Sequence, residues 1–216
     1  SLECISEILA HTPHIAEGCQ CGTVLRNHEE LTLEMVTEED RHYMWEEYAP
    51  ESRWRCNLGI RRRLSPLVDN DDAKIRLLNA MLLSLPGSPV LYYGDEIGMG
   101  DDPWLPDRDG VRTPMQWDDS ETAGFSTALP EDFHLPLIRT FGHDPEHVNV
   151  ARQLLDTSAR QVWKRARLGI RLLRPGGGTA EFTDLGGPDM AVRSCLRDNA
   201  HEPVLCLANL ADAEGR

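Results

Sequence analysis

The chain has 216 residues, 40% of them hydrophobic, which is enough to bury the core of one or two globular domains. Its 36 acidic residues outnumber the 22 basic ones and give a formal net charge of -14. Such a surface repels polyanions, so nucleic acid and anionic membrane are excluded as expected partners. The sequence also has no apolar run near the ~20 residues of a membrane span.

The cysteines of the chain indicate its cellular compartment, and its first residues indicate how its N-terminus arose. Six scattered cysteines suit a reducing cytosol better than a disulfide framework, and we expect a cytoplasmic location. Cys19 and Cys21 are too closely spaced for a typical zinc site, so no metal is expected there. Ser1 is neither an initiator methionine nor part of a basic signal region, which indicates an N-terminus cut from a longer chain.

The first half of the chain predicts a strand, helix, strand unit. A β-prone run at 22–26 and another at 88–93 flank a helix over 71–85, which has acids in its first turn and Pro86-Gly87 at its end. Three further segments are predicted: a helix over 2–9, a helix from a Thr37 cap to Ala49, and an irregular arginine-rich connector over 51–70.

The second half predicts a long loop, a helix and short strands. Residues 94–148 show little periodicity, and a loop of that length is usually functional. Apolar periodicity predicts one helix over 149–173, ended by the run from Pro175 to Gly178. Short β-prone pieces at 179–182, 190–196 and 204–210, with turn residues between them, predict antiparallel sheet.

Polar side chains follow both predicted strands of the first unit. The first strand is followed by Asn27, His28 and Glu29, and the second by Asp95 and Glu96. Parallel strands of α/β folds present their carboxyl ends to the substrate, so these residues predict an active site. Asp95 and Glu96 could bind calcium together with other oxygen ligands, or cap the following turn.

Four motifs, at residues 27–35, 58–64, 87–96 and 112–117, resemble the α-amylase superfamily of glycoside hydrolases and transglycosylases. The Arg-Thr-Pro-Met-Gln-Trp run narrows the resemblance to oligo-1,6-glucosidases and trehalose synthases, and the run after His28 favours the trehalose synthases. The resemblance implies interconversion of maltose and trehalose by retaining glucosyl transfer, without an organic cofactor. The implied partner is therefore a small disaccharide.

The implied fold is α/β: the C-terminal part of a (β/α)8 TIM barrel, followed by the start of an antiparallel β-sandwich. A whole barrel needs about 250 residues, and the strands at 22–26 and 88–93 resemble the seventh and eighth of such a barrel. We expect residues 1–174 to belong to the barrel and 175–216 to the sandwich. The family's nucleophile follows the fourth strand and its acid/base the fifth, so this chain alone is expected to be inactive. No cofactor is expected, although the resemblance leaves room for calcium in the intact enzyme.

The resemblance also assigns candidate site residues. Glu29 stands at the third carboxylate position, where the family has aspartate, and a misplacement of about 1 Å can cost roughly a hundredfold in rate. His28 would donate to a sugar hydroxyl and Asn27 would orient the turn. Arg108 either reaches the innermost sugar or ties its own acidic loop together. Trp104 and Trp117 either stack on sugar or anchor the loop.

Two alternatives to a trehalose-synthase-like enzyme stay open. One is an α-glucosidase or another α-amylase-type hydrolase. The other is a non-catalytic remnant or sugar-binding module that retains the surface of the fold without its chemistry. The arginines at 53, 55 and 61–63 are expected to form ion pairs in so acidic a chain.

Overall fold

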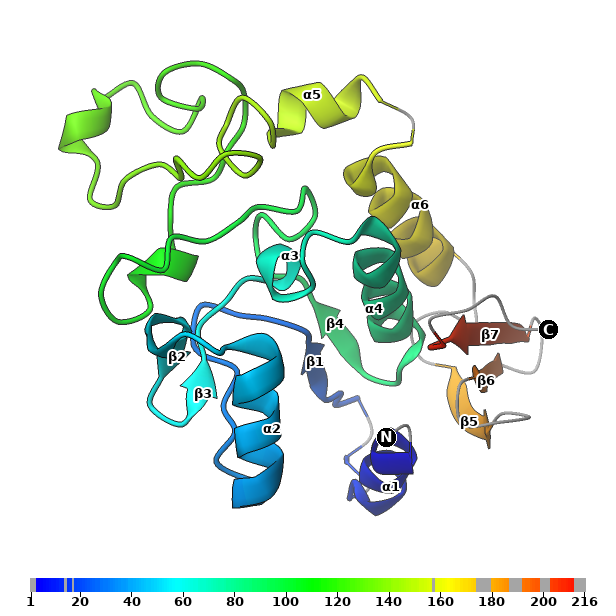
Figure 1. Ribbon diagram of the computed structural model, residues 1–216. Helices are drawn as coiled ribbons and strands as arrows, with labels where there is room; N and C mark the ends of the chain where they lie inside the picture. The colour runs from blue at the N-terminus through cyan, green and yellow to red at the C-terminus, as the bar shows by residue number, and fades with distance from the viewer. Residues whose placement is uncertain are drawn as a thin grey trace. The chain divides into compact units, whose positions relative to one another are not determined.

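The computed structural model describes residues 3–13, 15–16, 18–156, 158–173, 180–186, 192–198 and 203–211. The chain forms two compact units. The central unit comprises Val24–Ile75 and Leu91–Lys164, and the terminal unit comprises Ser1–Thr23, Arg76–Val90 and Arg165–Arg216. Figure 1 shows the helices and strands in chain order.

The helices and strands are bounded as follows. They are α1 (Glu3–His11), β1 (Gly22–Val24), α2 (Glu38–Tyr48), the 3-10 turn η1 (Ser52–Trp54), β2 (Arg55–Cys56), β3 (Gly59–Ile60), α3 (Leu64–Leu67), α4 (Asp72–Ser84), β4 (Ser88–Val90), the 3-10 turns η2 (Asp109–Val111) and η3 (Pro130–Asp132), α5 (Val150–Leu154), α6 (Arg160–Leu173), β5 (Glu181–Gly186), β6 (Val192–Asp198) and β7 (Val204–Asn209).

The predicted strand, helix, strand unit is present, with shorter strands than expected. β1 and β4 are neighbours in one two-stranded sheet, and α4 lies between them in the chain. Asp71 caps α4, since its Oδ1 accepts hydrogen bonds from Ala73 N at 2.8 Å and Lys74 N at 3.1 Å. Gly87 ends this segment at a positive φ of 94°, where a Cβ would lie 2.4 Å from the Cys21 carbonyl oxygen.

Helix α2 packs on a hairpin that the sequence did not predict. Thr37 caps the helix as expected, accepting a hydrogen bond from Asp40 N. The segment expected to be an irregular connector instead contains the antiparallel β2–β3 hairpin, which Figure 1 shows beside α2. Ile60 of that hairpin is fully buried and shares a core with Leu33 and Ala49. The hairpin cannot be predicted from local sequence, because it is stabilised by this core and by a β-bridge between Ile60 and Leu31.

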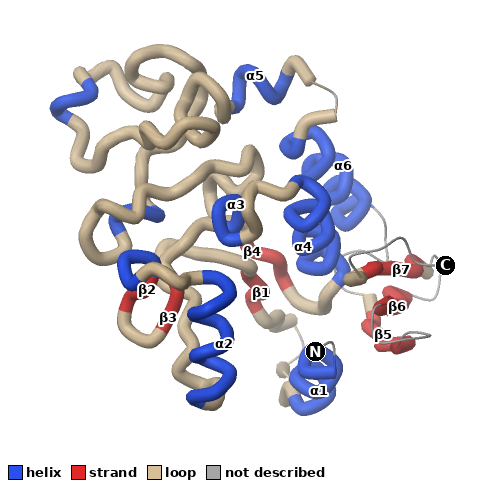
Figure 2. Tube along the Cα trace, in the orientation of Figure 1, coloured by secondary structure: helices blue, strands red, loops and turns tan. Residues whose placement is uncertain are grey.

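The long loop after β4 has a core of its own. Figure 2 shows residues 94–148 mainly as loop, in agreement with their lack of periodicity. The buried side chains of Ile97, Met99, Met115, Ile138 and Val148 nevertheless pack together. The loop is therefore held in a defined shape by burial of apolar side chains.

The single helix predicted over 149–173 is wrong, because the chain breaks it into α5 and α6. Between them, Asp156 Oδ1 accepts hydrogen bonds from Ser158 N at 2.8 Å and from Ser158 Oγ at 2.7 Å. Such local side-chain bonds compete with helical hydrogen bonding, which explains the break. The predicted stop at Pro175–Gly178 lies outside the described residues.

The short strands near the C-terminus form an antiparallel sheet in the order β5-β6-β7, as predicted, with somewhat shifted bounds. The register between β5 and β6 shifts between Asp184 and Gly186, which marks a bulge. The expected boundary between residues 174 and 175 falls outside the described residues and stays a prediction. In the part of the chain that the structure describes, no helix is both long and apolar enough to cross a membrane.

Candidate functional site

The turn after β1 brings the predicted residues Asn27, His28 and Glu29 together. Asn27 Oδ1 accepts a hydrogen bond from Glu29 N at 2.9 Å, a side-chain turn typical of asparagine. His28 Nε2 lies 3.5 Å from Glu29 Oε1. The side chains of His28 and Glu29 are 63% and 41% exposed, so both can meet a molecule from solvent.

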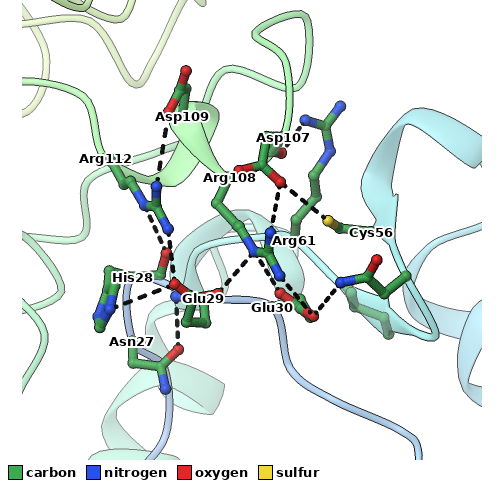
Figure 3. A network of polar contacts seen from close by, with 12 residues as sticks. Asn27, His28, Glu29, Glu30, Cys56, Arg61, Asp107, Arg108, Asp109 and Arg112 are labelled. Carbon is green, nitrogen blue, oxygen red and sulfur yellow. Dashed lines mark hydrogen bonds and ion pairs between the residues drawn. The ribbon is translucent and has the colours of Figure 1, made fainter.

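Two arginines from the distant loop hold the Glu29 carboxylate. Arg112 Nη2 donates to Oε1 at 2.8 Å, while Arg108 Nε lies 2.8 Å from Oε2 (Figure 3). Arg112 Nε also donates to the His28 carbonyl at 3.0 Å. Both carboxylate oxygens are therefore fixed by charge-assisted contacts. Sequence reasoning gave Arg112 no role, although it opens the Arg-Thr-Pro-Met-Gln-Trp motif.

Arg108 connects Glu29 to two more carboxylates. Its Nε and Nη2 donate to Glu30 Oε2 and Oε1 at 2.8 and 3.2 Å, and its Nη1 donates to Asp107 Oδ1 at 2.7 Å. Two roles were expected for Arg108, and its contact with Asp107 is the expected ion pair within its own acidic loop. A contact with sugar stays a prediction.

Glu30 is the least exposed acid of this network, whereas the sequence left open whether it supports the site residues or is merely exposed. Its side chain is 11% exposed, and Asn57 Nδ2 donates to its Oε1 at 2.9 Å. Burial acts to raise the pKa of Glu30, but the hydrogen bonds from Asn57 and Arg108 outweigh it, and the pKa is lowered. Glu30 therefore stays ionised and anchors the guanidinium that reaches Glu29.

The consecutive arginines at 61–63 fix the loop that carries Arg108. Arg61 donates to the backbone carbonyls of Pro103, Leu105 and Asp107. Arg62 Nε lies 3.0 Å from Asp101 Oδ2, and Arg63 N donates to the same oxygen at 2.7 Å. The expected ion pairs are confirmed for Arg53, Arg62 and Arg63, whereas Arg55 and Arg61 instead bond to carbonyls.

Asp95, which follows β4, has a different environment from Glu29. Asp95 is buried, with its Oδ1 3.8 Å from Arg63 Nη1, and Lys164 Nζ donates to its backbone carbonyl. Burial raises the pKa of Asp95 to about 6, although Arg63, Lys164 and Arg26 act in the opposite direction. The nearby Arg63 disfavours a calcium ion on this carboxylate, and calcium in the intact enzyme stays a prediction. Among the described residues, no group of three or more His, Cys, Asp or Glu side chains could hold a metal ion.

The two tryptophans of the loop are exposed. Trp104 is 79% and Trp117 48% exposed, and the Arg53 guanidinium lies 4.0 Å from the centroid of the Trp104 ring. An open hollow of about 660 Å³ lies beside Trp104, lined by Glu51, Ser52, Arg53, Arg61, Pro103, Trp104, Leu105 and Pro106. Trp104 is therefore too exposed to act as an interior packing anchor.

Comparison with known proteins places this chain in a family. Residues 32–167 match the family model of the alpha amylase catalytic domain, and the chain therefore belongs to the alpha-amylase family. It is 55% identical over 211 residues to trehalose synthase of Pimelobacter sp., which covers 96% of this chain and 37% of the relative. It is 43% identical over 208 residues to trehalose synthase of Thermus thermophilus, covering 96% and 22%. The chain thus spans roughly a third or less of these relatives.

A solved structure supports the fold. The trehalulose synthase MutB from Pseudomonas mesoacidophila MX-45 superposes with a TM-score of 0.57 at 24% identity, covering 71% of this chain and 34% of that one. The α/β architecture of the alpha-amylase family is therefore confirmed, and so is the expected resemblance to trehalose synthases.

Proposed function

We propose that this chain is the part of a trehalose-synthase-like enzyme that supplies the third carboxylate, Glu29, for retaining glucosyl transfer between maltose and trehalose. One observation carries the proposal: Glu29 follows β1 as a half-exposed carboxylate, with His28 beside it and Arg108 and Arg112 on its two oxygens. Similarity to trehalose synthases along nearly the whole chain supports this choice of reaction.

The proposed roles follow from the chemistry of each side chain. A glucosyl group passing through an oxocarbenium-like transition state is distorted, and a fixed carboxylate can accept hydrogen bonds from its hydroxyls as they strengthen. His28 would donate to a neighbouring hydroxyl, and Asn27 would keep the turn in shape. Arg108 and Arg112 would fix the carboxylate before substrate arrives, which avoids reorganisation during the reaction. Nucleophile and acid/base would come from carboxylates outside this sequence.

Retention of the cleaved glucose would decide between isomerisation and hydrolysis. If water reaches the glucosyl intermediate before the glucose has turned over, the product is free glucose and the enzyme acts as an α-glucosidase. The exposed Trp104 and Trp117 are candidates for limiting this access. A non-catalytic module is the remaining alternative. We further propose a cytoplasmic location, supported by the free thiols of Cys19, Cys21 and Cys56.

A chimera tests the proposal. Residues 22–118 replace the matching segment of the Pimelobacter synthase, and chromatography follows maltose, trehalose and glucose. We expect interconversion that is lost in Glu29→Gln and retained in Glu34→Gln, since Glu34 is an exposed acid on the same segment. The 216-residue chain alone should show no turnover. A folded chimera that is equally active with Glu29→Gln would refute the role of Glu29, and dominant glucose release would favour the glucosidase.

A further inference from the structure

Two cysteines face each other on neighbouring strands of the terminal unit. Cys195 on β6 and Cys206 on β7 are direct partners in the antiparallel register. Directly opposed residues have Cα atoms about 4.5 or 5.5 Å apart, depending on the type of pair. Both separations fall within the roughly 4.4–6.8 Å that disulfides span. The side chains of such a pair lie on the same face of the sheet.

The two thiols are free and already in contact. Each is a free cysteine, and their side chains are hydrogen-bonded to one another. Cys195 is 5% exposed, whereas Cys206 is half-buried. A reagent from solvent would therefore meet Cys206 first.

The groups around the pair favour a thiolate on Cys206. The pKa of Cys206 is lowered by the hydrogen bond from Cys195, with burial opposing and the positive charges of Arg197 and Arg171 adding to the lowering. The pKa of Cys195 is raised by the same hydrogen bond and by burial. The hydrogen bond with Ser84 and the positive charge of Arg193 lower it to a smaller extent. Arg171 is held in place because it donates to the backbone carbonyls of Leu83, Leu85 and Gly87. The pair thus resembles a nucleophilic thiolate next to a buried resolving thiol.

We propose that Cys206 and Cys195 form a reversible thiol-modification site, at which a low-molecular-weight disulfide such as oxidised glutathione converts the pair into a disulfide linking β6 to β7. The Cys206 thiolate attacks one sulfur of the reagent, forms a mixed disulfide and releases one glutathione thiolate, which takes up a proton. Cys195 then loses its proton, attacks the Cys206 sulfur and releases the second glutathione. Two protein thiols are oxidised and one glutathione disulfide is reduced.

Peptide mapping of the folded chain tests the site. The reduced 216-residue chain is incubated with oxidised glutathione, quenched with N-ethylmaleimide and digested with trypsin without reduction. Cleavage after Arg193 and Arg197 isolates Cys195 in residues 194–197 and Cys206 in residues 198–216. We expect these two peptides linked, with the combined mass reduced by a pair of hydrogen atoms. The double variant Cys19→Ser/Cys21→Ser is the matched control and should form the same link.

Single variants separate the two roles. Cys195→Ser should leave a stable glutathione adduct on Cys206, formed about tenfold faster at pH 7 in the folded chain than in denaturant. In the folded chain a serine hydroxyl can donate to the Cys206 thiolate in place of the Cys195 thiol, and the charges of Arg197 and Arg171 still favour that thiolate. Cys206→Ser should leave Cys195 alkylated only after unfolding. The proposal is overturned if both thiols stay free in the folded wild type, if Cys206 links to another cysteine, or if the link forms as fast in denaturant.

Discussion

Shortening Glu29 to aspartate tests whether the extra methylene is a defect. In the structure each carboxylate oxygen has an arginine nitrogen at 2.8 Å, from Arg112 and Arg108. Removing one carbon retracts the carboxylate by about 1.5 Å, one C–C bond length. Arg108 cannot easily follow, because Glu30 and Asp107 hold it. The aspartate carboxylate would thus leave these arginines and have the side-chain length of the residue that the family motif carries.

The expected gain is catalytic. A displacement of about 1 Å in a catalytic group changes rates by about a hundredfold, so Glu29→Asp should raise kcat about a hundredfold, equivalent to about 2.7 kcal/mol of transition-state stabilisation. Folding should barely change, because Glu29 is 41% exposed and solvent-exposed ion pairs contribute little. The retracted carboxylate keeps its charge, so the effect combines the new position with the loss of the contacts to Arg108 and Arg112.

The assay uses the chimera with the Pimelobacter synthase. Initial rates of maltose and trehalose interconversion are measured by chromatography, with free glucose followed separately. Glu34→Asp shortens an exposed acid of the same segment and should leave the rate unchanged. An unchanged or lower rate with Glu29→Asp would mean that the clamp by Arg108 and Arg112 already places the longer side chain correctly, and the reasoning would be wrong.

Two further predictions concern stability. Asp101→Ala leaves Arg62 and the Arg63 amide without their buried carboxylate. The free energy of unfolding, measured in urea, should therefore fall by about 3–5 kcal/mol, and Asp101→Asn should lose less. A loss below about 1 kcal/mol for Asp101→Ala would contradict this role of Asp101. Burial raises the pKa of Asp95 from 3.8 to about 6, so the folded state binds this proton more tightly than the unfolded state does. The stability of the wild type should therefore fall relative to that of Asp95→Asn as the pH rises from about 4 to about 6, and should stay level above that pH. A difference in unfolding free energy that does not vary with pH across this window would rule out the raised pKa.

Several features of the molecule could be predicted from sequence because local interactions determine them. The Thr37 cap and the Gly87 turn each involve bonds or backbone angles within a few residues. The position of Asn27, His28 and Glu29 at the end of a strand follows from the apolar run that precedes them. The antiparallel strands near the C-terminus follow from β-prone runs separated by turn residues.

Tertiary structure decided the remaining features, because the interactions that fix them join distant parts of the chain. Arg112 is 83 residues from Glu29, and Arg108 is 78 from Glu30, so no periodicity connects them. The β2–β3 hairpin depends on burial of Ile60 against Leu33 and Ala49, which the composition of the segment does not reveal. The pairing of Cys195 with Cys206 depends on strand register, and a shift of one residue would have put them on opposite faces. The sequence alone determined which residues could act, and long-range packing decided which of them meet.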